Sequence, residues 1–146
     1  MALMLAVLGR GVLVLWVGSL WTIGIIVAPT LFTVLPDTAL AGSVAGRLFT
    51  AEAWISVVSA PVLLLLWRRC YPDIGTWPGM VVASMGLLAA AGEWWLRPLM
   101  QAAREGVMGG SANFAFLHGL ASIMYFIVAG AGLALLCAPV WGRPRN

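Results

Sequence analysis

Four long apolar segments decide what this chain can fold into. They cover roughly residues 11–35, 50–67, 79–96 and 114–140, and arginine, proline or aspartate residues stand near the breaks between them. A helix needs about 20 mostly apolar residues to cross the hydrocarbon core of a bilayer. Such segments recur four times within 146 residues. The sequence therefore predicts a single all-α domain over residues 1–146, an integral membrane four-helix bundle.

The balance of apolar and charged residues agrees with a membrane protein. Hydrophobic residues make up 62% of the chain and charged residues only 9%, whereas soluble domains carry about 25% charged residues. All eight basic residues are arginines and they form no basic run, so we expect a lipid bilayer and no nucleic acid as partner. Arginine without lysine is typical of GC-rich genomes and favours a bacterial inner membrane.

The placement of the arginines predicts the orientation of the spans. One side of the predicted bundle carries Arg10, Arg68, Arg69, Arg143 and Arg145, and the other side carries Arg47, Arg97 and Arg104. Positive residues in short loops are enriched on the cytoplasmic side of a membrane. The excess of five over three predicts that both termini are cytoplasmic.

The outer connections are expected to contain short interfacial helices. Asp37 or Thr38 can cap a short helix over residues 41–49, and residues 99–113 predict a second interfacial helix followed by a glycine-rich turn. Pro29 is expected to bend the outer third of the first span, because proline removes one backbone hydrogen bond. Arg97 and Pro98 are expected to end the third span.

Three ionisable residues lie inside predicted spans and at similar depth. Glu52 is placed near the outer end of the second span, Glu93 about one turn below the outer end of the third, and His118 about one turn into the fourth. An ionisable group inside a span is costly unless it is paired or hydrated, so it normally faces the bundle interior. We therefore expect these three side chains to meet, with Arg47 and Arg97 beside them.

Helical spacing adds further polar groups to this face. Ser122 and Tyr125 follow His118 at i+4 and i+7, and Ser56 follows Glu52 at i+4. Ser19 and Thr22 are expected to look into the bundle from the first span. The candidate polar cluster therefore consists of His118, Glu52, Glu93, Arg47, Arg97, Ser122 and Tyr125.

This cluster admits several interpretations. In a buried polar clamp, Glu93 pairs with Arg97 at i+4 and Glu52 pairs with Arg47 or His118, which fixes the register of the helices. Alternatively, His118, Glu52 and Glu93 bind a divalent metal such as Zn(II) or Cu(II), or they pass protons. A haem held by His118 and a methionine is a further alternative. No P-loop, GxSxG or HExxH motif occurs, so we expect no enzyme activity and, on the clamp interpretation, no cofactor.

Three segments also carry a family resemblance. They are LWVGSLWTIGIIVAPTLFTVLPDTALAGSVAGRLFTAEAW, GEWWLRPLM and FAFLHGLASIMYFIVAGAGLAL. They resemble the bacterial branch of the transmembrane-protein-two-hundred-and-five-like domain family, which consists of small four-span membrane proteins. The resemblance implies a distant relation to copper-resistance-D-type membrane proteins and to a haem-binding protoporphyrinogen oxidase. The multiple histidines of those relatives are absent from this sequence.

Two functions remain as hypotheses from the sequence. The first is a structural or accessory membrane protein with a buried polar clamp near its outer face, which associates with a second copy or with other membrane proteins. The second is a component for transport or homeostasis of a metal ion, copper for example, or of a small solute, which uses an outer His/Glu site.

Overall fold

The chain is helical in the computed structural model, which describes residues 1–70, 76–106 and 110–138. The first span consists of α1 (Ala2–Trp21), the π-helical turn η1 (Thr22–Val27) and α2 (Ala28–Val34), and the second is α3 (Thr38–Cys70). The third consists of α4 (Trp77–Ala91), the π-helical turn η2 (Gly92–Leu96) and α5 (Arg97–Arg104), and the fourth is α6 (Gly110–Cys137). Four helices are long and apolar enough to cross a membrane. The predicted all-α four-helix membrane fold is confirmed, and its environment is a lipid bilayer.

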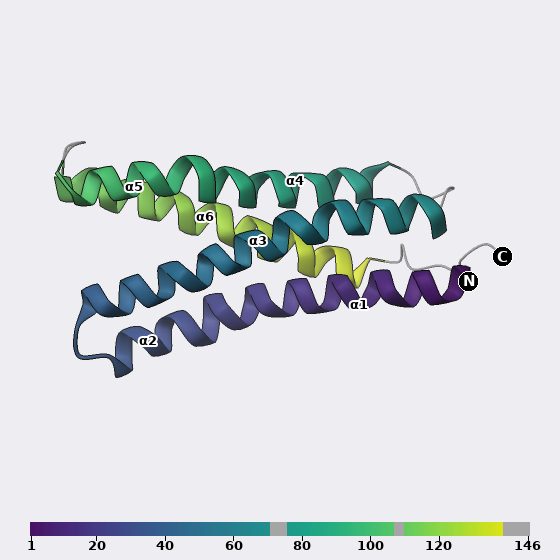
Figure 1. The fold of residues 1–146 in the computed structure, drawn as a ribbon, viewed down its shortest axis with the longest axis horizontal. Helices are drawn as coiled ribbons and strands as arrows, with labels where there is room; N and C mark the ends of the chain where they lie inside the picture. The colour runs from purple at the N-terminus through teal and green to yellow at the C-terminus, as the bar shows by residue number, and fades with distance from the viewer. Residues whose placement is uncertain (71–75, 107–109, 139–146) are drawn as a thin grey trace.

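The four spans pack in a closed square. α3 contacts both α1 and α4, and α6 contacts the same two helices from the other side. α1 and α4 run in the same direction, while α3 and α6 run in the opposite direction (Figure 1). The first and third spans are therefore parallel and lie on one diagonal of the square, which gives each of them two antiparallel neighbours.

The spans are longer than the sequence predicted, and the short interfacial helices do not exist as separate elements. The segment over residues 41–49 is the beginning of α3, which starts at Thr38 and is capped by a hydrogen bond from the Ala39 N–H to Asp37 Oδ1 of 2.8 Å. α3 has 33 residues, or about 50 Å at 1.5 Å per residue. That length exceeds the hydrocarbon core of about 30 Å, so the ends of α3 extend into the headgroup region.

Arg97 and Pro98 do not end the third span, contrary to the prediction. The backbone stays helical from α4 through η2 into α5, because Ala91, Gly92, Leu96 and Arg97 all have right-handed helical dihedrals. α5 ends at Arg104, and Gly106 follows with a φ of +77°, a left-handed conformation that glycine adopts without a steric penalty. The other predicted turn residues, 107–109, lie outside the described residues, as do residues 71–75.

Each π-helical turn precedes a proline by two residues. η1 ends at Val27 before Pro29, and η2 ends at Leu96 before Pro98. A proline ring clashes with the carbonyl four residues earlier and leaves that carbonyl without its donor. A π-helical turn widens the helix by one residue and absorbs this conflict. The prolines are therefore accommodated without breaking either span, and Pro61 is likewise inside α3.

The apolar core occupies the half of the bundle toward the start of α1. Its largest fully buried side chains are Trp16, Leu13 and Leu20 of α1 together with Met85 of α4 and Leu135 of α6. Gly132 of α6 allows the closest approach of three helices. A Cβ atom there would lie 2.6 Å from Val17 Cγ2 and 3.0 Å from Met85 Cε, so only a residue without a side chain fits.

Candidate functional site

The polar contacts inside the bundle converge on one stretch of α3, residues 50–56, which we call the polar segment. Thr50, Glu52 and Ser56 are each hydrogen-bonded to another helix. Glu52 contacts Ser19, which lies nine residues after Arg10 and 18 residues before Asp37. The polar segment therefore lies near the middle of α3, whereas the sequence predicted a position for Glu52 near the outer end of its span.

Glu52 is buried in the protein itself, with a side-chain exposure of 1%. Ser19 Oγ of α1 lies 3.1 Å from Glu52 Oε1 and 2.8 Å from the carbonyl oxygen of Trp16. Glu52 Oε2 has no hydrogen-bond partner among the described residues. Among the described residues, this carboxyl group is thus held at one of its two oxygens.

Trp16 and Ser56 form a second contact between α1 and α3. Trp16 Nε1 donates a hydrogen bond of 2.8 Å to Ser56 Oγ, and both residues are 1% exposed. Ser56 follows Glu52 by one helical turn, as its i+4 spacing predicted. The indole therefore fills the core with its rings and satisfies its only donor across the helix interface.

An ion pair lies on the opposite side of the polar segment. Arg97 Nη1 donates to Glu93 Oε1 and to Thr50 Oγ1, so the pair within the third span is also tied to α3. The predicted i, i+4 pairing of Glu93 with Arg97 is confirmed. Trp94 adds an edge contact with Trp54 of α3, at 5.3 Å between ring centroids.

Two aromatic side chains connect α1 and α6, each by a hydrogen bond to a backbone carbonyl of the other helix. Tyr125 of α6 donates its hydroxyl hydrogen to the Leu20 carbonyl at 2.5 Å, and Trp21 donates to the Ala129 carbonyl at 3.1 Å. The Tyr125 ring lies directly over Gly24 in η1, where a Cβ atom would come within 2.7 Å. Tyr125 thereby satisfies a carbonyl next to a π-helical turn, where the regular ladder of backbone hydrogen bonds changes register.

Replacing Tyr125 with phenylalanine removes this hydroxyl and keeps the ring. We expect the free energy of unfolding to fall by about 1 kcal/mol, the usual net value of one hydrogen bond. A titration with sodium dodecyl sulfate from mild detergent micelles measures it. The matched control is Phe126→Leu at the exposed neighbour, which we expect to change little. Equal stability of Y125F and the parent protein would contradict a role for the hydroxyl.

The structure does not bring His118 to Glu52 and Glu93, which corrects the predicted convergence. His118 is exposed and stacks on Phe114, with 5.8 Å between ring centroids. Ser122 turns its hydroxyl back to the His118 carbonyl at 2.9 Å. α6 crosses the bundle obliquely and meets α1 near Tyr125, while its beginning lies beside α5 (Figure 1). The face that Tyr125 presents to α1 is therefore uncovered at His118.

The predicted metal ligands His118, Glu52 and Glu93 do not form a metal site. Over residues 1–70, 76–106 and 110–138, no three His, Cys, Asp or Glu side chains are grouped so that they could hold a metal ion. Glu52 and Glu93 instead contact Ser19 and Arg97. Binding of a haem or another cofactor stays a prediction.

The polar cluster differs from the predicted set in its membership. Glu52, Glu93, Arg97 and Tyr125 take part in the contacts between helices, whereas Arg47 and His118 are exposed and Ser122 bonds only to its own helix. Sequence reasoning placed Ser19 and Ser56 on inward faces and left them out of the cluster, and it placed Thr22 inward although Thr22 is exposed. Trp16 and Thr50 were not predicted as members of the cluster. The sequence pointed to them only by spacing, since Trp16 lies three residues before Ser19 and Thr50 lies two residues before Glu52.

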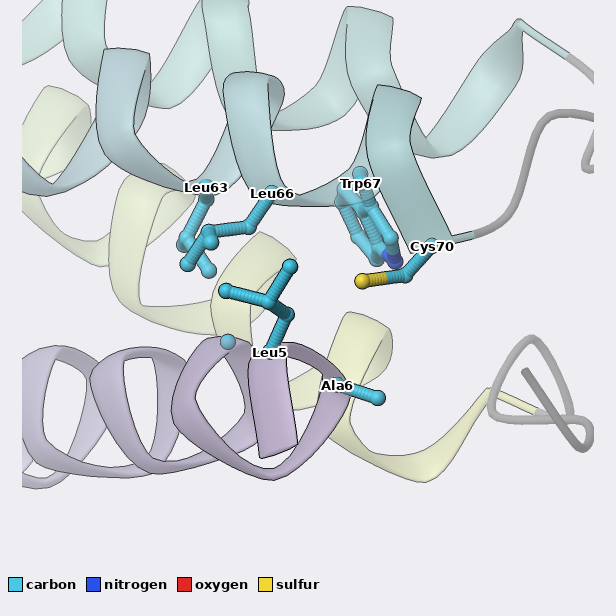
Figure 2. Close-up of a pocket in the computed structure, with 7 residues that line it drawn as sticks. Leu5, Ala6, Leu63, Leu66, Trp67 and Cys70 are labelled. Carbon is cyan, nitrogen blue, oxygen red and sulfur yellow. The ribbon is translucent and has the colours of Figure 1, made fainter. Parts of the chain in front are cut away.

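Neither of two cavities contains a residue of the polar cluster. The first lies between the beginning of α1 and the end of α3, where Leu5, Ala6 and Cys70 line a space of about 10 Å³ (Figure 2). That is room for at most one water molecule, in apolar surroundings that do not retain one. The second is an apolar groove of about 370 Å³ between α4 and α6, with Trp77 and Met80 among its lining residues. Lipid chains suit such a surface without any specific site.

Comparison with known proteins gives a family and no activity. A family model described as a domain of unknown function, DUF4149, matches residues 11–108. The match covers the first three spans, and α6 lies beyond it. No curated protein and no solved structure matches the chain. The resemblance to the transmembrane-protein-two-hundred-and-five-like family and to copper-resistance-D-type proteins stays a prediction. Since the match extends over more than half of the 146 residues, the chain belongs to the DUF4149 family of domains of unknown function.

Proposed function

We propose that the chain is a structural or accessory protein of the bacterial inner membrane, with a polar clamp that fixes its four helices in register. The observation that carries the proposal is that the buried polar groups bond between helices. Trp16 and Ser19 join α1 to α3, Tyr125 joins α6 to α1, and Arg97 joins the third span to α3. Buried polar side chains that hydrogen-bond between helices are typical of a bundle whose helices are held in one arrangement.

The position of these contacts explains why they would stabilise one arrangement. In lipid, apolar side chains gain little by leaving one helix surface for another, so packing and polar contacts decide how helices associate. A rotation or shift of α1 relative to α3 would break the contacts of Trp16 and Ser19 together. The clamp lies in the middle of the bundle rather than near its outer face, and it leaves the outer surface of the helices apolar.

A protein of this kind acts through its surface, and the exposed side chains are accordingly large and apolar. Trp95 in η2 and Phe116 in α6 are each 72% exposed, and Leu15 in α1 is 75% exposed. The excess of arginines on one side supports cytoplasmic termini. We propose that one of these faces binds a second copy of the chain or another membrane protein.

Photo-crosslinking in intact membranes tests this function. A photoreactive phenylalanine analogue replaces Phe116, Trp95 or Leu15 in three separate variants, which sample three different helices. We expect one position to give a discrete crosslink to a second copy or to one integral membrane protein, and the same crosslink to be weakened in an Arg97→Gln background. Crosslinks to lipid alone from all three positions would contradict an accessory role.

A further inference from the structure

The two contacts of the Ser19 hydroxyl need one more hydrogen atom than the hydroxyl carries. Its Oγ lies within hydrogen-bond distance of two acceptors, the Trp16 carbonyl at 2.8 Å and Glu52 Oε1 at 3.1 Å. A serine hydroxyl carries one hydrogen, and an ionised carboxylate carries none. With Glu52 ionised, one of the two contacts is left without a hydrogen. With a proton on Glu52, the acid donates to Ser19 Oγ and Ser19 donates to the Trp16 carbonyl, so both contacts are complete.

The burial of Glu52 agrees with a proton at this position. The side chain is 1% exposed, and its Oε2 has no hydrogen-bond partner among the residues that the structure describes. An ionised carboxylate at such a site would be a buried charge with one oxygen unsatisfied, which is costly. A neutral carboxylic acid avoids that charge.

The neighbouring charged groups do not neutralise Glu52. The elements η1, α2 and α4 contain no titratable residue. α1 carries Arg10, which lies nine residues before Ser19, or about 13 Å along the helix at 1.5 Å per residue. From the third span, Arg97 is bound to Glu93 and to Thr50. Thr50 precedes Glu52 by two positions, and side chains two positions apart face different sides of a helix. Arg47 on α3 is exposed, and α6 contributes Tyr125, which packs edge-on against Phe49 and donates to Leu20.

We propose that Glu52 is a proton-binding site in the centre of the bundle. In the protonated state, the hydrogen bonds run from Glu52 to Ser19 and from Ser19 to the Trp16 carbonyl. When the proton leaves to water, Ser19 rotates its hydroxyl hydrogen from the Trp16 carbonyl to the carboxylate. The ligand is a proton, Glu52 holds it, and Ser19 is the positioning residue that serves both states. This inference does not depend on the accessory role proposed above.

Labelling with dicyclohexylcarbodiimide tests for the proton. This apolar reagent partitions into lipid and adds to a protonated carboxyl group, and rearrangement of the adduct gives a stable N-acylurea with no atom lost. We expect the full chain in lipid nanodiscs to gain the mass of one reagent on Glu52, located by peptide mapping, with labelling that falls as the pH rises. The Glu52→Gln variant is expected to lose this adduct. Glu93→Gln is the matched control and is expected to keep it.

Two outcomes would overturn the proposal. The first is labelling of Glu52 that does not change with pH. The second applies if the reagent does not reach this side chain, which is 1% exposed: no adduct on Glu52 together with no infrared C=O band of a carboxylic acid at neutral pH. Both are measured on the parent protein, so a folding defect in E52Q leaves the test intact.

The pH profile of labelling in a Ser19 variant tests the role of Ser19 separately. In the ionised state of Glu52, Ser19→Ala removes the hydroxyl that donates to the carboxylate. In the protonated state, it removes the oxygen that accepts from the acid. The bond to the charged carboxylate is the stronger of the two, so the ionised state loses more. We therefore expect the adduct on Glu52 to form up to a higher pH in this variant than in the parent protein. A pH profile identical to that of the parent would show that Ser19 does not position the proton. Crosslinking from Phe116, Trp95 and Leu15 is expected to be the same in both, which separates this result from the accessory role.

Discussion

Replacing Arg97 with glutamine will lower the free energy of unfolding by about 1–3 kcal/mol, the usual cost of removing one partner of a charge-assisted hydrogen bond, because the ion pair is only partly buried. Arg97 is the partner of Glu93 and also donates to Thr50. The Glu93 side chain is only 14% exposed. Its charge would remain there without a counter-ion, and the third span would lose its polar contact with α3.

The double variant E93Q/R97Q is the control that separates charge from shape. With both charges removed, two neutral amides of similar size replace the pair, and breaking a pair costs more than replacing it. We expect most of the lost stability to return, measured by the same titration with sodium dodecyl sulfate. A double variant that is as unstable as R97Q would show that the buried charge of Glu93 is not the cause.

Replacing Trp16 with alanine will also lower the free energy of unfolding by about 3–5 kcal/mol, as for other large aromatic residues removed from a core. Trp16 is 1% exposed and belongs to the apolar core of the bundle. Its removal opens a cavity between α1 and α3, and it leaves Ser56 Oγ without the indole donor. Unfolding is followed by circular dichroism, because the substitution alters the tryptophan fluorescence.

A double-mutant cycle separates the hydrogen bond from the packing at this position. Trp16→Phe removes the donor and part of the ring, and Ser56→Ala removes the acceptor. We expect a coupling energy between these two substitutions of about 1 kcal/mol, in the range of one hydrogen bond. Additive effects of W16F and S56A would mean that Trp16 stabilises the bundle by packing alone.

The fold could be predicted because hydrophobic length is a strong and local signal. Each span could be predicted from the apolar residues of its own segment, without knowledge of the helices beside it. All four segments form long apolar helices in the structure. The ends of the spans could not be predicted as well, because a separate short helix was expected over residues 41–49 and Arg97 was expected to end the third span. Arginine has a long apolar stem and can reach an interface from within a helix. α3 continues on both sides of Arg47, so Glu52 lies near the middle of this helix rather than near its outer end.

The candidate site could be predicted only where both partners lie on one helix. The pair of Glu93 and Arg97 follows from i, i+4 spacing and is confirmed. The meeting of His118 with the carboxylates depended on how α6 is tilted against α1, which sequence spacing does not contain. Tyr125 and His118 share a helical face, yet Tyr125 bonds to Leu20 and His118 is exposed. Contacts such as Trp16 with Ser56 link residues 40 positions apart and need the three-dimensional arrangement.

The two π-helical turns divide the bundle mechanically. After η1 the first span continues for the seven residues of α2, and after η2 the third span continues for the eight residues of α5. These spans run in the same direction (Figure 1), so the turn stands before the last helical segment of both, α2 in the first span and α5 in the third. Wide turns and prolines are where a helix bends at least cost. A bend at η1 would move α2 and leave Ser19 in place against Glu52, because Ser19 precedes this turn in the chain.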